Sequence, residues 1–212
     1  MNLVFLGPPG VGKGSLAVRI AKDYGLLHIS TGEMLRAEIS AGTHTGKLAE
    51  KYINDGNLMP DSLIIEMLLS KLQHSTAKQG YILDGFPRTL NQAQELDKFV
   101  QIDAAINLDA PEAVLLKRIS HRRICPVCGK GYISYMMSSN LCEQCGVEVI
   151  MRDDDKEEVV KARLVEYHTK TEPIIDYYRS TGKLISVDGD DTMEGVAAKV
   201  EEILEDLKLA NN

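Results

Sequence analysis

The sequence predicts a three-layer α/β/α fold in which helices cover both faces of a five-stranded parallel sheet. Five short apolar segments alternate with segments of helical periodicity, at 3–6, 26–29, 81–84, 104–108 and 184–188. Strands that are apolar along their whole length are typical of parallel sheets buried on both faces. A polar residue or a glycine ends each segment: Gly7, Ser30, Asp84, Asp109 and Asp188. Because ligands of such sheets bind at the carboxyl ends of the strands, we expect a binding site at this edge.

Helices are expected between these strands and after the last one. Apolar spacing and Gly or Pro breaks place the first four at 13–24, 31–41, 44–54 and 60–73. A fifth follows Arg88 and ends at about 99, and a sixth follows Asp109. The last three are expected at 156–170, 172–181 and 192–208. Ser30 and Glu33 fit a capping box at the start of the second helix. The acidic run Asp153-Asp154-Asp155 is interpreted as a solvated helix start, in which Asp155 and Glu158 form a capping pair.

Size and charge narrow the class of protein. A chain of 212 residues can hold one domain with inserts and bury a substantial core. The net charge of −7 argues against non-specific binding to nucleic acid, which relies on a basic surface. The first apolar run stops at Gly7, too early for a secretory signal, and no later run approaches the length of a membrane span. We therefore expect a cytoplasmic protein without nucleic-acid or membrane partners.

The residues after the first strand are typical of a phosphate-binding loop: Gly7-Pro8-Pro9-Gly10-Val11-Gly12-Lys13-Gly14-Ser15. Glycines allow backbone N–H groups to turn around an anion, and the N-terminus of the following helix adds partial positive charge. Lys13 supplies a point charge for the outer phosphates. In most such loops a Ser or Thr directly follows the lysine and binds Mg²⁺ through its hydroxyl group. Here Gly14 occupies that position, and Ser15 is one residue further along the chain.

Asp84 and a set of arginines extend this phosphate site. A carboxylate at the end of a strand beside a phosphate loop can orient Mg²⁺ through its water molecules. Arginine dominates the segments around the expected site, at Arg36, Arg88, Arg118, Arg122, Arg123, Arg152 and Arg163. Several planar, bidentate donors can spread charge across a transferring phosphoryl group. For any single arginine, an ordinary surface ion pair is the alternative.

All four cysteines lie in one segment that interrupts the strand–helix pattern. Cys125-Pro126-Val127-Cys128-Gly129 and Cys142-Glu143-Gln144-Cys145-Gly146 are two CxxC knuckles, each followed by glycine. This spacing is typical of a closed tetrahedral site with four thiolates, in which zinc would be structural. Iron bound by the same thiolates is the alternative metal.

Together these motifs resemble the adenylate kinase family, in its long form with a zinc-bearing lid. The resemblance extends over essentially the whole chain and rests on four segments: 7–15, 30–36, 84–89 with Gln92, and 163–167. Lys13-Gly14-Ser15 is the form that the phosphate loop takes in this family. The resemblance implies reversible, Mg²⁺-dependent transfer of the ATP γ-phosphoryl group to AMP. This reaction gives two ADP and maintains adenine nucleotide balance, and the enzyme would be a monomer with structural Zn²⁺.

The resemblance also implies which residues meet each nucleotide. ATP would contact Gly10, Val11, Gly12, Lys13, Gly14, Ser15, Arg122, Gly131 and Tyr132. AMP would contact Thr31, Arg36, Asn57, Leu58, Met59, Gly85, Phe86, Pro87, Arg88, Gln92, Arg152 and Arg163. The transferring group would be stabilised by Lys13, Arg88, Arg118, Arg122, Arg152 and Arg163, while Asp84 would orient Mg²⁺ through water. A cis peptide is implied before Pro87.

The implied domains are a core at 1–29, 60–121 and 160–212, an NMP-binding insert at 30–59 and a zinc-binding lid at 122–159. Two other functions remain open. A UMP/CMP kinase is the nearest alternative. Those kinases resemble a Ser-Ala-Gly version of Ser30-Thr31-Gly32 and tend to have Asn in place of Gln92, so the resemblance at Thr31 and Gln92 implies adenine rather than a pyrimidine. A phosphate-loop switch or zinc ribbon that binds nucleic acid is the second, but between the knuckles Lys130 is the only basic side chain, and Glu143 and Glu148 oppose it.

Overall fold

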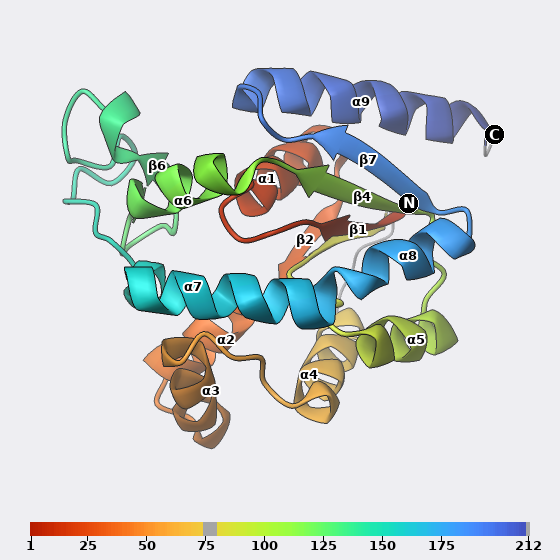
Figure 1. Ribbon diagram of the computed structural model, residues 1–212, viewed down its shortest axis with the longest axis horizontal. Helices are drawn as coiled ribbons and strands as arrows, with labels where there is room; N and C mark the ends of the chain where they lie inside the picture. The colour runs from red at the N-terminus through yellow and green to blue at the C-terminus, as the bar shows by residue number, and fades with distance from the viewer. Residues whose placement is uncertain (74–79, 211–212) are drawn as a thin grey trace.

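A parallel sheet of five strands lies at the centre of the molecule (Figure 1). The computed structural model describes residues 1–73 and 80–210. The strand order is β2-β3-β1-β4-β7, and each pair of neighbours is parallel. The strands are β1 (Asn2–Leu6), β2 (Leu27–Ser30), β3 (Tyr81–Asp84), β4 (Ala104–Asp109) and β7 (Leu184–Asp188). The five-stranded parallel sheet expected from the sequence is therefore confirmed.

The helices follow the expected order along the chain. They are α1 (Lys13–Tyr24), α2 (Thr31–Ser40), α3 (His44–Asn54), α4 (Asp61–Gln73), α5 (Leu90–Phe99), α6 (Glu112–Ser120), α7 (Glu157–Glu166), α8 (Pro173–Ser180) and α9 (Met193–Ala210). The Ser30 hydroxyl caps α2 by accepting a hydrogen bond from the backbone N of Glu33 at 3.4 Å. This is the N-terminal half of the expected capping box.

Side-chain alternation in β1 places apolar groups on both faces of the sheet. Leu3 and Phe5 pack in a cluster with residues of α1 and α9, whereas Val4 and Leu6 pack with residues of α5 and α8. Since successive residues of a strand point to opposite faces, both sides of this central strand must be covered by helices. The resulting three layers hold the carboxyl ends of the strands at one edge.

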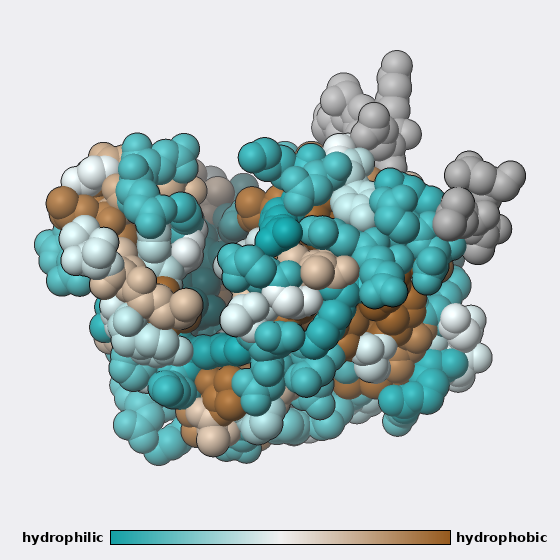
Figure 2. Space-filling model, turned by 90° about the horizontal axis from the view of Figure 1, so that it is seen from above, coloured by the Kyte–Doolittle hydropathy of each residue, from teal (hydrophilic) through white to brown (hydrophobic). Residues whose placement is uncertain are grey.

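Two segments project from this core (Figure 1). Helices α2 and α3 form the first, at the bottom of the view. The second is a lobe at the left, which begins with the two-stranded antiparallel sheet of β5 (Arg122–Ile124) and β6 (Gly131–Ile133). It continues through the 3₁₀ turn Ser134–Met136. Figure 2 shows a recess between this lobe and the rest of the molecule.

The segment after the lobe differs from the single helix expected at 156–170. Helix α7 ends at Glu166, and a π-helical turn over Tyr167–Thr171 joins it to α8. Thr171 is buried, and its hydroxyl donates to the backbone carbonyl of Arg88 at 2.9 Å. Wider π turns inside helices frequently occur at functional sites. Here the turn ties the α7–α8 connection to the loop after β3.

The acidic run before α7 contradicts its interpretation as a solvated helix start. Asp153–Asp155 forms a 3₁₀ turn, and Asp154 and Asp155 are only 8% and 3% exposed. Lys156 occupies the N-cap position of α7 and no side chain caps the helix, so the expected pair of Asp155 with Glu158 does not form. The two buried carboxylates instead neutralise arginines, as described below. Across the described ranges, none of the helices is both long and apolar enough to cross a membrane.

Candidate active site

The loop between β1 and α1 has the backbone conformation of an anion cradle. Gly10 and Gly12 have φ angles of 88° and 107°, a region that side chains with a Cβ rarely adopt. Gly12 is the N-cap of α1 and no side chain caps that helix, so its first N–H groups remain available to an anion. Lys13 Nζ donates to the backbone carbonyls of Gly7 at 2.6 Å and Pro8 at 2.8 Å. The ammonium group is therefore held over the loop.

Lys13 lies among other charged groups of the site. Burial lowers the pKa of Lys13 to about 7; the negative charge of Asp84 opposes this shift, and the positive charges of Arg88, Arg163 and Arg122 add to it. A bound phosphate would favour the charged form of the amine, because opposite charges stabilise each other strongly where water is excluded. This position is therefore suited to an anionic ligand.

Asp84 ends β3 next to the phosphate loop, and a Cβ placed on Gly14 would lie 3.4 Å from its Oδ2. Burial alone would raise the pKa of Asp84, but the hydrogen bond from His28 and the charges of Lys13 and Arg88 lower it on balance. The carboxyl group is thus held ionised, as a partner of hydrated Mg²⁺ must be. His28 Nε2 lies 3.4 Å from Asp84 Oδ2, and His28 was not among the residues expected at the site.

A pocket lies between α2, the loop after α3 and the loop after β3. Its volume is about 80 Å³, and all the residues expected to contact AMP line it except Phe86 and Pro87. Phe86 is buried, and the expected cis peptide joins it to Pro87. Thr31 Oγ1 donates to the carbonyl of Gly85 at 2.8 Å, which fixes the first turn of α2 to this loop.

Gln92 is held at both ends of its amide. Its Oε1 accepts from the backbone N of Arg88 at 2.7 Å, and its Nε2 donates to Asp61 Oδ1 at 2.7 Å. The other carboxylate oxygen of Asp61 accepts from Thr89 Oγ1 at 2.8 Å. Asp61 was absent from the residues expected at the site, since a single carboxylate at the start of a helix resembles an ordinary helix-end residue.

Three of the expected arginines gather around the two buried aspartates. Arg152 forms a bidentate pair with Asp154, with both N···O distances 2.8 Å. Arg163 contacts the same carboxylate at 3.1 Å and Asp155 at 3.3 Å. Arg122 donates to Asp155 Oδ2 at 2.7 Å and also pairs with its Oδ1. Residues up to 41 positions apart in the chain, from Arg122 to Arg163, thus form one network at the base of the lobe.

Burial and the neighbouring opposite charges shift the pKa values of this network in opposing directions. Burial would raise the pKa of Asp154, but the charges of Arg163, Arg152 and Arg122 lower it to about 2. Burial lowers the pKa of Arg163 to about 10, and it lowers that of Arg36 to about 10 with a contribution from Arg152. Asp154, Arg163 and Arg36 therefore remain charged at neutral pH.

Arg118 lies outside this network. Its guanidinium donates to the backbone carbonyls of Gly189 at 2.7 Å and Asp191 at 3.1 Å, which belong to the loop after β7. A longer bond of 3.4 Å reaches the carbonyl of Val11. In this arrangement Arg118 joins the phosphate loop to the loop after β7.

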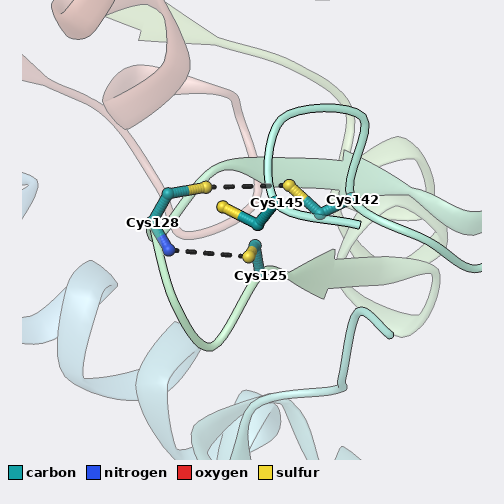
Figure 3. Close-up of side chains that lie close together, drawn as sticks. All are labelled: Cys125, Cys128, Cys142 and Cys145. Carbon is teal, nitrogen blue, oxygen red and sulfur yellow. Dashed lines mark hydrogen bonds between the residues drawn. The ribbon is translucent and has the colours of Figure 1, made fainter. Parts of the chain in front are cut away.

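The four cysteines converge in the lobe (Figure 3), and their sulfur atoms all lie within 4.8 Å of one another. Cys128 Sγ and Cys142 Sγ are 3.7 Å apart. Tetrahedral zinc with Zn–S bonds of about 2.3 Å places its sulfur ligands about 3.8 Å apart. The donor set and its spacing therefore fit a closed metal site.

The two knuckles have the same backbone geometry. Gly129 N donates to Cys125 O at 3.0 Å, and Gly146 N donates to Cys142 O at 2.8 Å. Both glycines have positive φ angles, 73° and 68°. Tight turns of this kind let backbone N–H groups point at thiolates, as the bond from Cys128 N to Cys125 Sγ at 3.5 Å shows (Figure 3).

Gly131 and Tyr132, the two residues of the lobe expected to contact the base end of ATP, have different neighbours. A Cβ on Gly131 would be 3.8 Å from Ser15 Oγ, so this part of the lobe contacts the start of α1. The Tyr132 hydroxyl donates to Cys142 Sγ at 3.2 Å and accepts from Glu143 N at 3.2 Å. The tyrosine hydroxyl is thus directed toward the cysteines, which the sequence did not indicate.

Comparisons with known proteins agree with this geometry. The family model described as adenylate kinase matches residues 5–183. The chain is 48% identical to an adenylate kinase of Archaeoglobus fulgidus, over 98% of this chain and all of the relative. It is 45% identical to one of Thermodesulfovibrio yellowstonii, over 97% and 99% of the two chains, and 43% identical to one of Acetivibrio thermocellus, over 99% and 100%. The chain therefore belongs to the adenylate kinase family of nucleoside monophosphate kinases.

Proposed function

We propose that the protein catalyses the reversible, Mg²⁺-dependent transfer of the γ-phosphoryl group of ATP to AMP, which gives two ADP and maintains adenine nucleotide balance. The observation that carries this proposal is the charge of the pocket. Arg36, Arg88, Arg152 and Arg163 line it, and Asp154 is the one carboxylate among its lining residues within the described ranges. Such a surplus of buried positive charge requires an anionic ligand.

The position of this pocket relative to Lys13 supports a phosphate acceptor rather than a lone anion site. The charges of Arg88 and Arg163, which line the pocket, act on Lys13 in the phosphate loop. ATP would occupy the cradle formed by Gly10 to Ser15, with Gly131, Tyr132 and Arg122 at its lobe side. AMP would occupy the pocket, where Thr31, Gln92 and the backbone of 57–59 would surround the base.

In this mechanism the chain positions both nucleotides and stabilises charge, and no general base is needed. Lys13, Arg88, Arg122, Arg152 and Arg163 would neutralise the oxygens of the transferring group. Arg118 would act once its bonds to the loop after β7 are exchanged for phosphate. Bound Mg²⁺ would supply further charge neutralisation, and the ionised carboxylate of Asp84 would hold its water molecules. The inserts at 30–59 and 122–159 would close over the nucleotides and exclude water.

A structural zinc ion in the lobe is part of this proposal. Cys125, Cys128, Cys142 and Cys145 form a closed set with no position left for substrate, so the metal would hold the shape of the lid.

We further propose that the protein is a cytoplasmic monomer that acts on small nucleotides. Size-exclusion chromatography with light scattering at micromolar concentration tests this state, and a dimer would contradict it.

The decisive experiment is a coupled assay of the purified protein with ATP and each of AMP, UMP, CMP and GMP. We expect AMP to give the highest kcat/KM, because Thr31 and Gln92 fit the pattern for adenine. Faster turnover of UMP or CMP would instead support the UMP/CMP kinase alternative. Salt-sensitive binding to DNA or RNA without phosphotransfer would support a nucleic-acid-binding protein and overturn both.

A further inference from the structure

The loop that follows α3 rests directly on helix α7. A Cβ placed on Gly56 would lie 3.0 Å from the carbonyl oxygen of Val159 and 3.2 Å from Cγ of Arg163. Two residues later, the backbone N of Leu58 donates to Oε1 of Glu166 at 3.4 Å. The loop therefore touches α7 at two successive levels.

These contacts all lie on one face of α7. Val159, Arg163 and Glu166 are spaced by four and three residues, the spacing of side chains that share a helix face. The same face thus supports the wall of the pocket and carries a guanidinium that lines it. A shift of the loop along α7 would change the distance between two parts of the pocket. One is the wall formed by residues 57–59, which is proposed to contact the base of AMP, and the other is the guanidinium of Arg163, which is proposed to contact its phosphate.

Glu166 also forms an ion pair with Lys170 at 2.6 Å. Taken alone, this would be a common surface pair one helical turn apart, which contributes little. Its environment differs from that of such a pair, because the side chain of Glu166 is 16% exposed whereas that of Lys170 is 48% exposed. The carboxylate therefore faces the loop, and the lysine covers it from outside.

We propose that Glu166 is a positioning residue for the AMP subsite, holding the loop 57–59 in register with Arg163 through the N–H of Leu58. This proposal rests on the proposed function. Glu166 acts through the loop and does not touch the reacting atoms. Its removal affects recognition of the nucleoside monophosphate and leaves the ATP side unchanged, because the hydrogen bonds of Glu166 go to Leu58 in the loop and to Lys170 in the π turn after α7, and neither residue belongs to the phosphate loop.

The test compares Glu166→Ala and Glu166→Gln with the control Lys170→Ala, which removes the ion pair and keeps the contact with Leu58. With the wild-type protein active on AMP, Glu166→Ala is expected to raise KM for AMP about tenfold, the effect of losing one hydrogen bond to a charged group. KM for ATP and kcat are expected to stay within about twofold. Glu166→Gln, which keeps a neutral acceptor, is expected to raise KM for AMP about threefold.

Exchange of the Leu58 amide hydrogen, measured by NMR, tests the contact without any assay of activity. Glu166→Ala should accelerate this exchange and Lys170→Ala should not. The proposal is overturned if exchange at Leu58 is unchanged, if KM rises equally for ATP and AMP, or if Lys170→Ala reproduces the effect of Glu166→Ala. Failure of the proposed function is a different result, since the wild-type protein would then not phosphorylate AMP while Leu58 could still respond to Glu166.

Discussion

Arg122 and Asp155 stand 33 positions apart in the chain, and Nε of Arg122 donates to Oδ2 of Asp155 at 2.7 Å. Arg122 begins β5, and Asp155 is the last residue of the 3₁₀ turn before α7. Their pair therefore joins the two chain segments through which the lobe leaves and re-enters the core. Because the same arginine is proposed to contact ATP, the closure at the base of the lobe and the phosphate site share one side chain.

Replacement of Asp155 by Asn should destabilise the protein and lower its activity. The carboxylate side chain is 0% exposed, and its loss leaves Arg122 and Arg163 without this partner. Removal of one partner of a buried pair costs about 3 kcal/mol of unfolding free energy, the lower end of the usual range, because both arginines are partly exposed. Urea denaturation measures the change.

The neighbouring Asp153→Asn is the matched control for this measurement. Asp153 is 85% exposed and pairs with Lys156 at 3.2 Å on the surface. Its replacement should change the unfolding free energy by less than about 0.5 kcal/mol. Equal destabilisation by the two variants would contradict the role assigned to Asp155.

Binding of nucleotide should be coupled to uptake of a proton by Lys13. Its folded-state pKa of about 7 lies below its ordinary value of 10.5, so the amine is mostly neutral in the free protein at pH 8.5. Phosphate favours the charged form, and binding at pH 8.5 should therefore take up a proton, whereas at pH 6 the amine is already charged. Calorimetry in two buffers of different ionisation enthalpy measures the uptake.

Lys13→Met is the control for proton uptake and a test of the loop. The variant should bind nucleotide without uptake at pH 8.5, and its kcat should fall by about 10²–10³-fold, as for loss of one preorganised charge in a closed site. Its fold should remain intact. In the protein without nucleotide, the buried amine of Lys13 lowers the free energy of unfolding most below pH 7. This destabilisation decreases as the pH rises from 7 toward 10.5, because in that range the unfolded state binds more protons than the native state. Wild-type-like turnover by Lys13→Met would rule out this reading of the loop.

Replacement of His28 should weaken the response to Mg²⁺. The hydrogen bond from His28 favours the ionised form of Asp84, so its loss in His28→Leu raises the pKa of that carboxyl group. The acid limb of the activity profile should therefore move to higher pH, and the Mg²⁺ concentration for half-maximal activity should rise. His168→Gln, on the exposed side of the π turn, serves as the control. Identical Mg²⁺ dependence in His28→Leu and the wild type would show that His28 is only a packing residue.

Removal of zinc should destabilise the lobe before it affects the chemistry. The four cysteines form a closed set with no position left for substrate, so the proposed metal would support the shape of the lobe rather than act on the reacting groups. After chelation and removal of the chelator, metal analysis should show loss of one ion per chain, and the melting temperature should fall. A melting temperature that stays the same after verified metal loss would contradict the structural role.

Features that depend on residues close together in the chain were determined by the sequence alone. The phosphate loop and the two knuckles need only glycines, a lysine and cysteines at fixed short spacings, because their hydrogen bonds join residues a few positions apart. The strand–helix alternation likewise predicted the parallel sheet, since apolar periodicity reports burial directly. The edge of the sheet at which the site lies followed from this.

Only the tertiary structure decided which charged groups meet. The spacing of Asp153–Asp155 fits a helix start equally well, and nothing local shows that Arg122 would reach Asp155 from 33 positions away or that Arg163 of the following helix would fold back onto it. The contacts of His28 with Asp84, of Gln92 with Asp61 and of Leu58 with Glu166 are of the same kind. Each joins groups at least 30 positions apart, so its formation depends on how the helices pack around the sheet, and short-range patterns do not record that packing.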